Sequence, residues 1–233
     1  MPNDVENNLT FDGNEKDIKE LMDCLVINGE PSVDGFLPMP SELRGTTSPS
    51  RVENQVLINK YGHDNWYDWA VENWGTKWGF YSGIVTSDNS VYFQTAWATP
   101  YKAIQKLSEK FPRVAIKVQY ADEEFGYNVG EYTLLSGDEI EINIPDGGSF
   151  EAIKMAMEIK EEYEWYLLEI IDALEDDEIK DRVEDDFYIN ILKVAVYNQV
   201  FYEEIHNIIK EKMIQLAIDV EDYRFAQKIY KTM

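Results

Sequence analysis

The order of strand-like and helix-like patterns is the sequence feature that most constrains the fold of this chain. Residues 6–12 alternate weakly as a strand, and a helical stripe follows the cap at Asn14. Residues 79–96 form the clearest hairpin pattern, and a helix begins at Pro100. Residues 113–120 then alternate strictly between apolar and polar side chains. The predicted order is strand, helix, strand, strand, helix, strand.

This order is that of a ferredoxin-like sheet with a segment inserted after its first helix. The inserted segment, residues 28–75, opens with a Pro-, Gly- and Ser-rich stretch over residues 28–49, which predicts an irregular excursion. A further hairpin over residues 131–144 extends the sheet. We therefore predict an α+β fold for residues 1–145, with a mostly antiparallel ferredoxin-like sheet, inserted helices and an extra hairpin.

Residues 150–233 change to helical periodicity, which predicts an acidic all-α C-terminal segment. Between Glu161 and Tyr188 there are thirteen acids and two bases, whereas residues 189–202 contain no acid. A solvated helical face is one interpretation of this run, and a partner-binding surface is the other. The candidate partner-binding residues are Tyr163, Trp165, Tyr166, Glu175, Asp176, Asp177 and Glu178.

Tryptophans gather around one short stretch of the chain. Asp64 is a good helix cap, Gly75 is a good stop, and the helix predicted between them is apolar on most of its circumference. We therefore expect Trp69 and Trp74 to be mainly structural. Lys77 is either a lysine whose stem packs on tryptophan rings or a cation at an exposed aromatic site. The predicted aromatic cluster is Trp66, Trp69, Trp74, Lys77, Trp78 and Trp97.

The formal net charge of -24, from 45 acids and 21 bases, restricts the partners. Such a field repels phosphate, so we expect neither direct nucleic-acid binding nor attachment to an anionic membrane. A protein partner with a basic surface fits better. A single cysteine, Cys24, excludes an internal disulfide and is expected to be buried. With no signal-like N-terminus and no long apolar run, we expect a cytoplasmic protein.

Metal, cofactor and catalytic motifs are not predicted. His63 and His206 lie far apart in the sequence, and neither has a second ligand at metal-binding spacing. Asp122, Glu123 and Glu124 precede Phe125 in a predicted loop, where a solvated acidic loop is favoured over a hard-cation site because no EF-hand spacing is present.

Four short motifs resemble the YubB ferredoxin-like family, whose members are proteins of phages and plasmids. They are Met1-Pro2-Asn3, Pro38-Met39-Pro40 followed by Glu42-Leu43, Trp69 with Asn73-Trp74-Gly75-Thr76-Lys77-Trp78, and Thr95-Ala96-Trp97 with Pro100. The chain departs from the family where it has Asp4-Val5 and Gly79. Over residues 1 to about 144, the resemblance implies a ferredoxin-like fold and a mobile-element origin, with no established activity.

Three functional classes follow. The first is a non-catalytic module that binds a host protein, as an inhibitor of host defence or transcription. The second is a nucleic-acid mimic in which the carboxylates of residues 161–188 occlude a basic groove. The third is an enzyme that uses the tryptophan-rich pocket, and it ranks last because no nucleophile, base or cofactor motif accompanies it.

Overall fold

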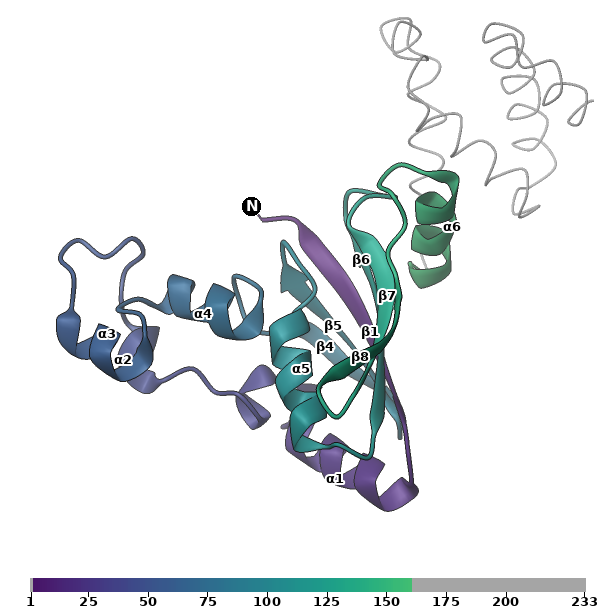
Figure 1. Ribbon diagram of the computed structural model, residues 1–233, viewed down its shortest axis with the longest axis horizontal. Coiled ribbons are helices and arrows are strands. Elements are labelled where there is room, and N and C mark those ends of the chain that lie inside the picture. The colour runs from purple at the N-terminus through teal and green to yellow at the C-terminus, as the bar shows by residue number, and fades with distance from the viewer. Residues whose placement is uncertain (1, 161–233) are drawn as a thin grey trace, which may run out of the picture. The chain divides into compact units, whose positions relative to one another are not determined.

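The computed structural model describes residues 2–160 (Figure 1). The chain divides into two compact units, one of residues 1–124 with 128–144, and one that contains residues 125–127 and continues from residue 145. The predicted acidic segment beyond residue 160 lies outside the described residues, and so do its seven candidate partner-binding residues, which stay a prediction.

A six-stranded sheet forms the centre of the first unit. Every neighbouring pair of strands is antiparallel. In spatial order the strands are β4 (Tyr81–Ser87), β5 (Ser90–Ala96), β1 (Asp4–Asp12), β6 (Ala115–Asp122), β7 (Val129–Leu135) and β8 (Asp138–Asn143). The first four have the order expected of a ferredoxin-like sheet, and β7 and β8 are the extra hairpin at its edge. The predicted α+β fold class is therefore confirmed.

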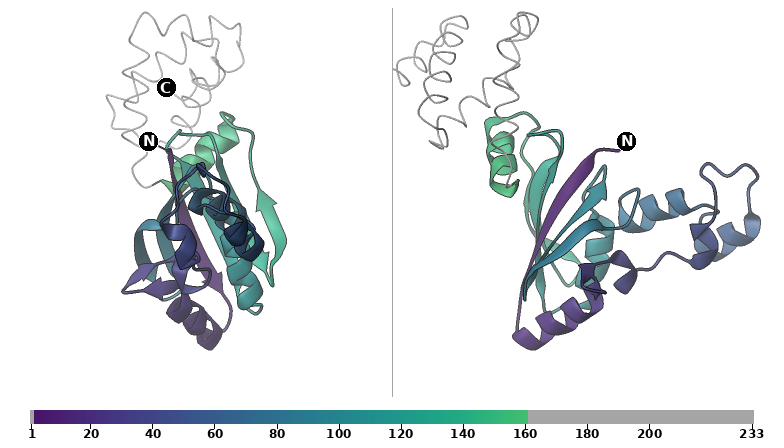
Figure 2. Two further views of the ribbon diagram at one scale, coloured as in Figure 1. Left: turned by 90° about the vertical axis from the view of Figure 1, so that its left-hand side faces the viewer. Right: turned by 180° about the vertical axis from the view of Figure 1, so that it is seen from behind.

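Two helices, α1 (Glu15–Leu25) and α5 (Tyr101–Lys110), pack on one face of this sheet (Figure 2). Their apolar stripes meet alternate residues of the strands, because side chains at every second strand position point to the same face. The fully buried core includes Leu9, Phe11, Leu21, Leu25, Phe93, Ile104, Leu107, Ile116 and Leu134.

The opposite face of the sheet is mostly polar. On it, β1 presents Glu6 and Asn8, and β5 presents Gln94 and Tyr92, all of them half-buried. On the neighbouring strands, Lys117 and Glu131 form an ion pair of 2.9 Å across the sheet. Alternation of apolar and polar residues along the strands produces this division between a core face and a water-facing one.

The inserted segment builds a second, smaller core. With the two residues before it, the segment contains β2 (Val26–Ile27), β3 (Glu30–Pro31), the 3-10 turn η1 (Val33–Gly35), α2 (Ser41–Arg44), α3 (Gln55–Tyr61) and α4 (Trp66–Trp74). Residues 28–49 are thus more ordered than the predicted irregular excursion, because one short strand, one 3-10 turn and one short helix form within them. This core includes Val33, Met39, Leu43, Trp69, Ala70 and Trp74, and it reaches Ala103 of α5.

The start of α4 differs from the sequence prediction, because the Asp64 side chain is used elsewhere. Its carboxylate accepts hydrogen bonds from the Ser50 hydroxyl (2.6 Å) and the Asn54 backbone N–H (2.9 Å). Ser50 is thereby held outside α3, which begins only after the side-chain cap of Asn54. The cap of α4 is Asn65 in place of Asp64. Because these bonds favour the charged form, the pKa of Asp64 is lowered.

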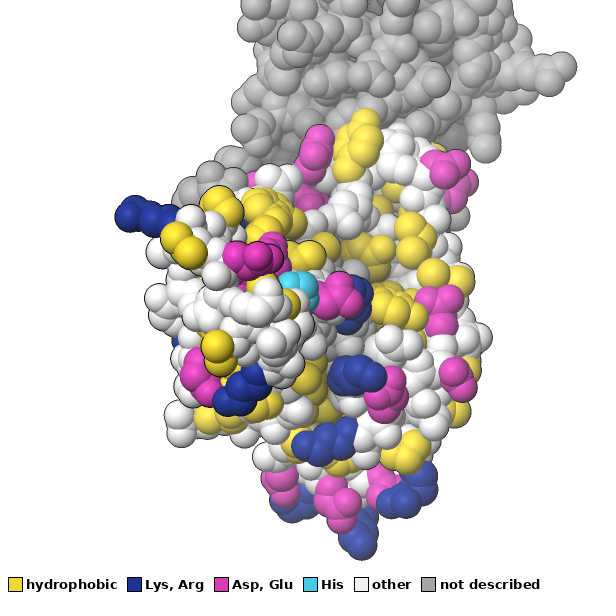
Figure 3. All heavy atoms as spheres, turned by 60° about the vertical axis from the view of Figure 1, so that its left-hand side comes forward, with side chains coloured by type: hydrophobic (Ala, Val, Ile, Leu, Met, Phe, Trp, Pro, Cys, Tyr) yellow, Lys and Arg dark blue, Asp and Glu magenta, His cyan; other side chains and the backbone are white. Residues whose placement is uncertain are grey.

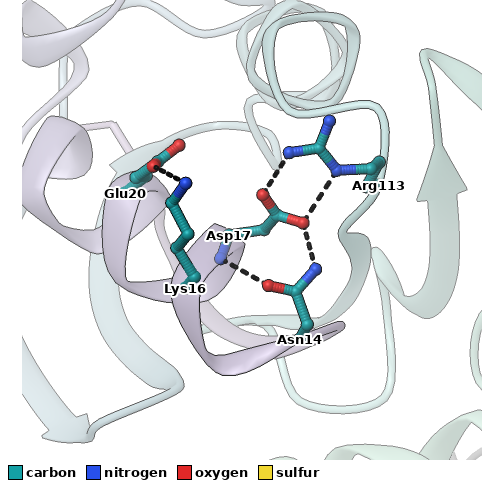
Figure 4. Close-up of polar contacts among 5 residues, drawn as sticks. All are labelled: Asn14, Lys16, Asp17, Glu20 and Arg113. Atoms are coloured by element: carbon teal, nitrogen blue, oxygen red, sulfur yellow. Dashed lines mark hydrogen bonds and ion pairs between the residues drawn. The ribbon is translucent and has the colours of Figure 1, made fainter.

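A buried carboxylate fixes the first turn of α1 to the loop before β6 (Figure 4). Asn14 caps the helix as predicted, accepting from the Asp17 backbone N–H at 3.0 Å. The Asp17 carboxylate accepts from Asn14 and from both Nε and an Nη of Arg113, with 2.8 Å to Nε. These charge-assisted bonds, chiefly those from Arg113, lower the pKa of Asp17 to about 2.

Following β8 in the chain, α6 (Phe150–Ile159) begins at the cap Ser149 and buries Ile153 and Met157, as the helical periodicity predicts.

Within residues 2–160, no helix is long and apolar enough to cross a membrane. Cys24 is half-buried rather than buried as predicted, and its thiol donates to the Gly35 carbonyl oxygen and accepts from the Lys110 ammonium.

Candidate functional site

The tryptophan cluster divides into a core part and a surface part. Trp69 and Trp74 are each only 6% exposed, and their rings meet edge to face with centroids 5.4 Å apart. The Trp74 indole N–H donates to the Leu37 carbonyl oxygen at 2.9 Å, so the one polar atom of its ring is satisfied. The rest of the apolar circumference of α4 is only partly covered, since Val71 is exposed and Tyr67 is half-buried.

The two residues after α4 are fixed against the sheet. Gly75 ends the helix at a φ of 81°, a left-handed conformation that favours glycine, and its Cα faces the backbone of Lys102 in α5. Thr76 is buried, and its hydroxyl donates to the Ala96 carbonyl oxygen at 2.6 Å. The chain therefore leaves α4 beside the end of β5, and Lys77 and Trp78 come next to Trp97.

Trp97 lies in an unusual backbone conformation directly after β5. Its φ is 74°, which bulky side chains rarely adopt. Its N–H donates to the Asn3 carbonyl oxygen at 2.9 Å, and its own carbonyl oxygen accepts from the Asn128 amide at 3.1 Å. Both asparagine side chains donate in turn to the buried carboxylate of Asp122. This network holds a strained residue in place, and such strain is typical of binding sites.

Lys77 connects the two exposed tryptophans. Its Nζ lies 4.8 Å from the ring centroid of Trp78 and 4.4 Å from that of Trp97, over the face of each ring. Trp78 is 41% exposed and Trp97 is 45% exposed. Tyr81 packs edge-on against Trp78, and Tyr67 packs edge-on against Trp97, so each ring is supported on its outer side. We call Tyr67, Lys77, Trp78, Tyr81 and Trp97 the aromatic site.

Acidic groups adjoin the aromatic site. The Tyr81 hydroxyl donates to the Asp4 carboxylate at 2.7 Å. Burial and this acidic partner both raise the pKa of Tyr81, so the phenol stays protonated at neutral pH. Glu123 is exposed next to Asp122, and its N–H donates to the Asp4 carbonyl oxygen. The arrangement therefore consists of rigid aromatic faces beside carboxylates, which suits binding of a cationic or apolar group.

Of the six residues predicted as an aromatic cluster, the structure brings Lys77, Trp78 and Trp97 into direct contact. Trp66 is half-buried, and its ring meets the edge of Tyr67 at 5.7 Å. Tyr67 and Tyr81, which support these rings, lie outside the predicted cluster, although both are aromatic residues close to the tryptophans in the sequence.

The network behind Trp97 also differs from the prediction. The sequence predicts a solvated loop at Asp122, but this residue lies at the end of β6 with 5% exposure, because Asn3 and Asn128 enclose it. Glu123 and Glu124 are exposed as predicted. Within the described part of the chain, no group of three or more His, Cys, Asp and Glu side chains is arranged to hold a metal ion.

The surface around the inserted segment shows mixed charge. On the face in Figure 3, acidic and basic side chains are interspersed, and hydrophobic side chains are exposed between them. Ion pairs account for part of this alternation. The ammonium of Lys60 lies 2.7 Å from Glu42, and that of Lys102 lies 3.3 Å from Glu72.

Comparison with known proteins supports the fold. Residues 73–169 match the family described as the ferredoxin-like domain in Api92-like protein. The match begins at the Asn73-Trp74 motif and spans β4 to α6, which is less than half of the chain. A search of curated proteins found no match, and neither did a search of solved structures. The chain is thus similar to a ferredoxin-like family over this range.

Proposed function

We propose that this protein is a non-catalytic binding module that engages a host protein with a basic surface through the aromatic site. The observation that carries the proposal is the pair of exposed tryptophans, Trp78 and Trp97, held in fixed orientation around one lysine. Aromatic anchors of this kind supply much of the binding energy at protein interfaces, because a rigid ring loses little conformational entropy when it is covered.

Charge supports a basic protein as the partner. The chain has a formal net charge of -24, and carboxylates of Asp4 and Glu123 lie beside the aromatic residues. A basic surface is attracted by this field, whereas phosphate groups are repelled.

The helix-free face of the sheet argues against a nucleic acid as the partner. Ferredoxin-like modules that bind RNA stack bases on aromatic residues of this face. Here β1 and β5 present Glu6, Asn8 and Gln94 on this face, with Tyr92 as the one aromatic side chain that these two strands place there, and Glu131 lies further along the sheet. A glutamate near a phosphate is unfavourable, so a protein partner is the better fit.

The origin and role of the module are part of the proposal. The resemblance of its short motifs to the YubB ferredoxin-like family supports an origin in a phage or a plasmid. A mobile-element protein that binds a host protein without catalysis is suited to inhibit it, and we propose host defence or transcription as the target. The acidic segment beyond residue 160 offers a second surface for the same basic partner, or for a nucleic-acid mimic, and this stays a prediction.

The proposal is tested by comparing proteins captured from host lysate by the wild-type chain and by the double variant Trp78→Ala and Trp97→Ala. We expect the variant to lose the captured protein at both low and high salt, because aromatic contacts contribute beyond the screened charges. The double variant Ile142→Ala and Ile144→Ala is the matched control. These isoleucines are each 56% exposed but lie at the β8 end of the sheet, away from the aromatic residues.

Melting temperatures of both double variants establish that each remains folded. A captured protein that the tryptophan variant retains, and that the isoleucine variant loses, would contradict the proposal and place the interface at the β8 edge.

A further inference from the structure

We infer that the aromatic site is a receptor for a single organic cation of the partner, an arginine or lysine side chain, and that Lys77 occupies the receptor until the partner displaces it. The inference rests on the proposed function and specifies the group that the partner inserts. It follows from the geometry of Lys77, from the support of the two rings and from the charges around them.

The position of Lys77 is that of a bound cation. Its Nζ lies over two ring faces at 4.8 and 4.4 Å, within the distance at which an ammonium is attracted by the ring quadrupole. Lys60, Lys102 and Lys117 instead pair with glutamates at 2.7, 3.3 and 2.9 Å. Among residues 2–160, Lys77 has no carboxylate within ion-pair distance, so the tryptophan rings are its main partners.

The rings form a rigid pair that does not depend on Lys77. Trp97 is held by the hydrogen bonds from Asn128 and to Asn3, and Tyr67 supports its ring. Trp78 is supported by Tyr81, which is itself bonded to Asp4. A preformed aromatic pair loses little entropy on binding, so a second cation can replace the lysine without rebuilding the site.

The surroundings favour a cation over an anion. A carboxylate approaching the Lys77 ammonium would also approach Asp4, Glu123 and the net charge of -24. A guanidinium is attracted by the same carboxylates, and its planar face stacks well on tryptophan. It is also less strongly hydrated than an ammonium, so it can displace Lys77, whose own head group then returns to water.

The test is a titration of the full chain with capped arginine, N-acetyl-arginine methylamide, followed by NMR of the tryptophan indole N–H signals. Single Trp→Phe variants assign these signals. Capped citrulline, which has the same shape without the charge, is the matched ligand control, and capped glutamate tests the anion alternative. We expect saturable shifts of the Trp78 and Trp97 signals with capped arginine alone.

Two variants test the role of Lys77. Lys77→Ala vacates the receptor and is expected to tighten the binding of capped arginine by about three- to tenfold, the scale of a partly solvated cation–π contact. Lys77→Arg keeps a resident cation that stacks at least as well as the lysine, so it is expected to bind capped arginine no more tightly than the wild type does. Equal or weaker binding by Lys77→Ala would overturn the inference. Shifts produced by capped glutamate and abolished by Lys77→Ala would overturn it in favour of an anion site.

The two proposals fail separately. If capped arginine leaves the Trp78 and Trp97 signals unmoved, while capture from lysate still requires these tryptophans, the cation receptor is wrong and the binding module stands. If capped arginine binds as expected but capture is independent of the tryptophans, the receptor stands and the proposed interface is wrong.

Discussion

At the scale of the residue, side chains of the same type have different roles in this protein. Trp74 is buried and donates its indole N–H to a backbone carbonyl, whereas Trp78, four residues later, is 41% exposed beside a lysine. The change occurs at Gly75, where the helix ends and the chain turns along the end of β5. One short motif therefore supplies both a core anchor and a surface group.

Asp17 gives a prediction for the pH dependence of stability. Its pKa is lowered from 3.8 to about 2, chiefly by hydrogen bonds from Arg113. A carboxyl with a depressed folded-state pKa stabilises the protein above the unfolded value and loses this contribution as pH falls through the folded value. We expect Asp17→Asn to lower the melting temperature at pH 7, and the gap to the wild type to close between about pH 4 and pH 2.

Asp23→Asn is the control for this prediction, because Asp23 lies on the same helix in an exposed pair with Lys19. Exposed pairs of this kind contribute little, so its melting curve should follow that of the wild type at each pH. A gap between Asp17→Asn and the wild type that stays constant down to pH 2 would show that the carboxylate charge is not what stabilises this contact.

At the scale of the element, the inserted segment is joined to α1 of the ferredoxin-like domain by a close backbone contact. Gly35, at the end of η1, packs against α1 so tightly that a Cβ atom would lie 2.0 Å from the Cys24 carbonyl oxygen. Within the segment, the Trp74 indole N–H donates to the Leu37 carbonyl oxygen, which ties α4 to the chain after η1.

The close approach at Gly35 predicts a large difference between two similar substitutions. Gly35→Ala must move η1 away from α1, and we expect it to lower the free energy of unfolding by about 3 kcal/mol or more. Gly45→Ala is the matched control, since nothing lies within 4 Å of its added methyl group. It should change the free energy of unfolding by less than about 0.5 kcal/mol. Urea denaturation of both variants measures this, and equal effects would show that η1 is free to shift.

The elements were largely predictable from sequence, and the site only in part. Alternation and helical spacing are local signals, so the strand order and the hairpin over residues 79–96 followed from them. The placement of Trp78 and Trp97 on either side of Lys77 is not local. It depends on strand register, in which Asp4 pairs with Ala96 and Val5 pairs with Asp122, and on side-chain bonds of Asn3 and Asn128. No periodicity in the sequence encodes these contacts.

At the scale of the whole molecule, the protein combines a ferredoxin-like sheet with a strongly acidic charge and an exposed aromatic pair. The core face of the sheet is filled by α1 and α5, and the opposite face is mostly polar. The aromatic site lies where the end of β5, the start of β1 and the chain after α4 come together. A partner that reaches it meets both tryptophans and the neighbouring carboxylates at once.

Hydrogen–deuterium exchange of the full chain, with and without its captured partner, tests most directly whether this aromatic site is the interface. The account predicts that the partner slows exchange in peptides that cover residues 76–81 and 96–98. Peptides that cover β8, residues 138–143, are expected to exchange at unchanged rates. Protection confined to residues 161–188, with none around Trp78 and Trp97, would contradict the account and assign binding to the acidic segment.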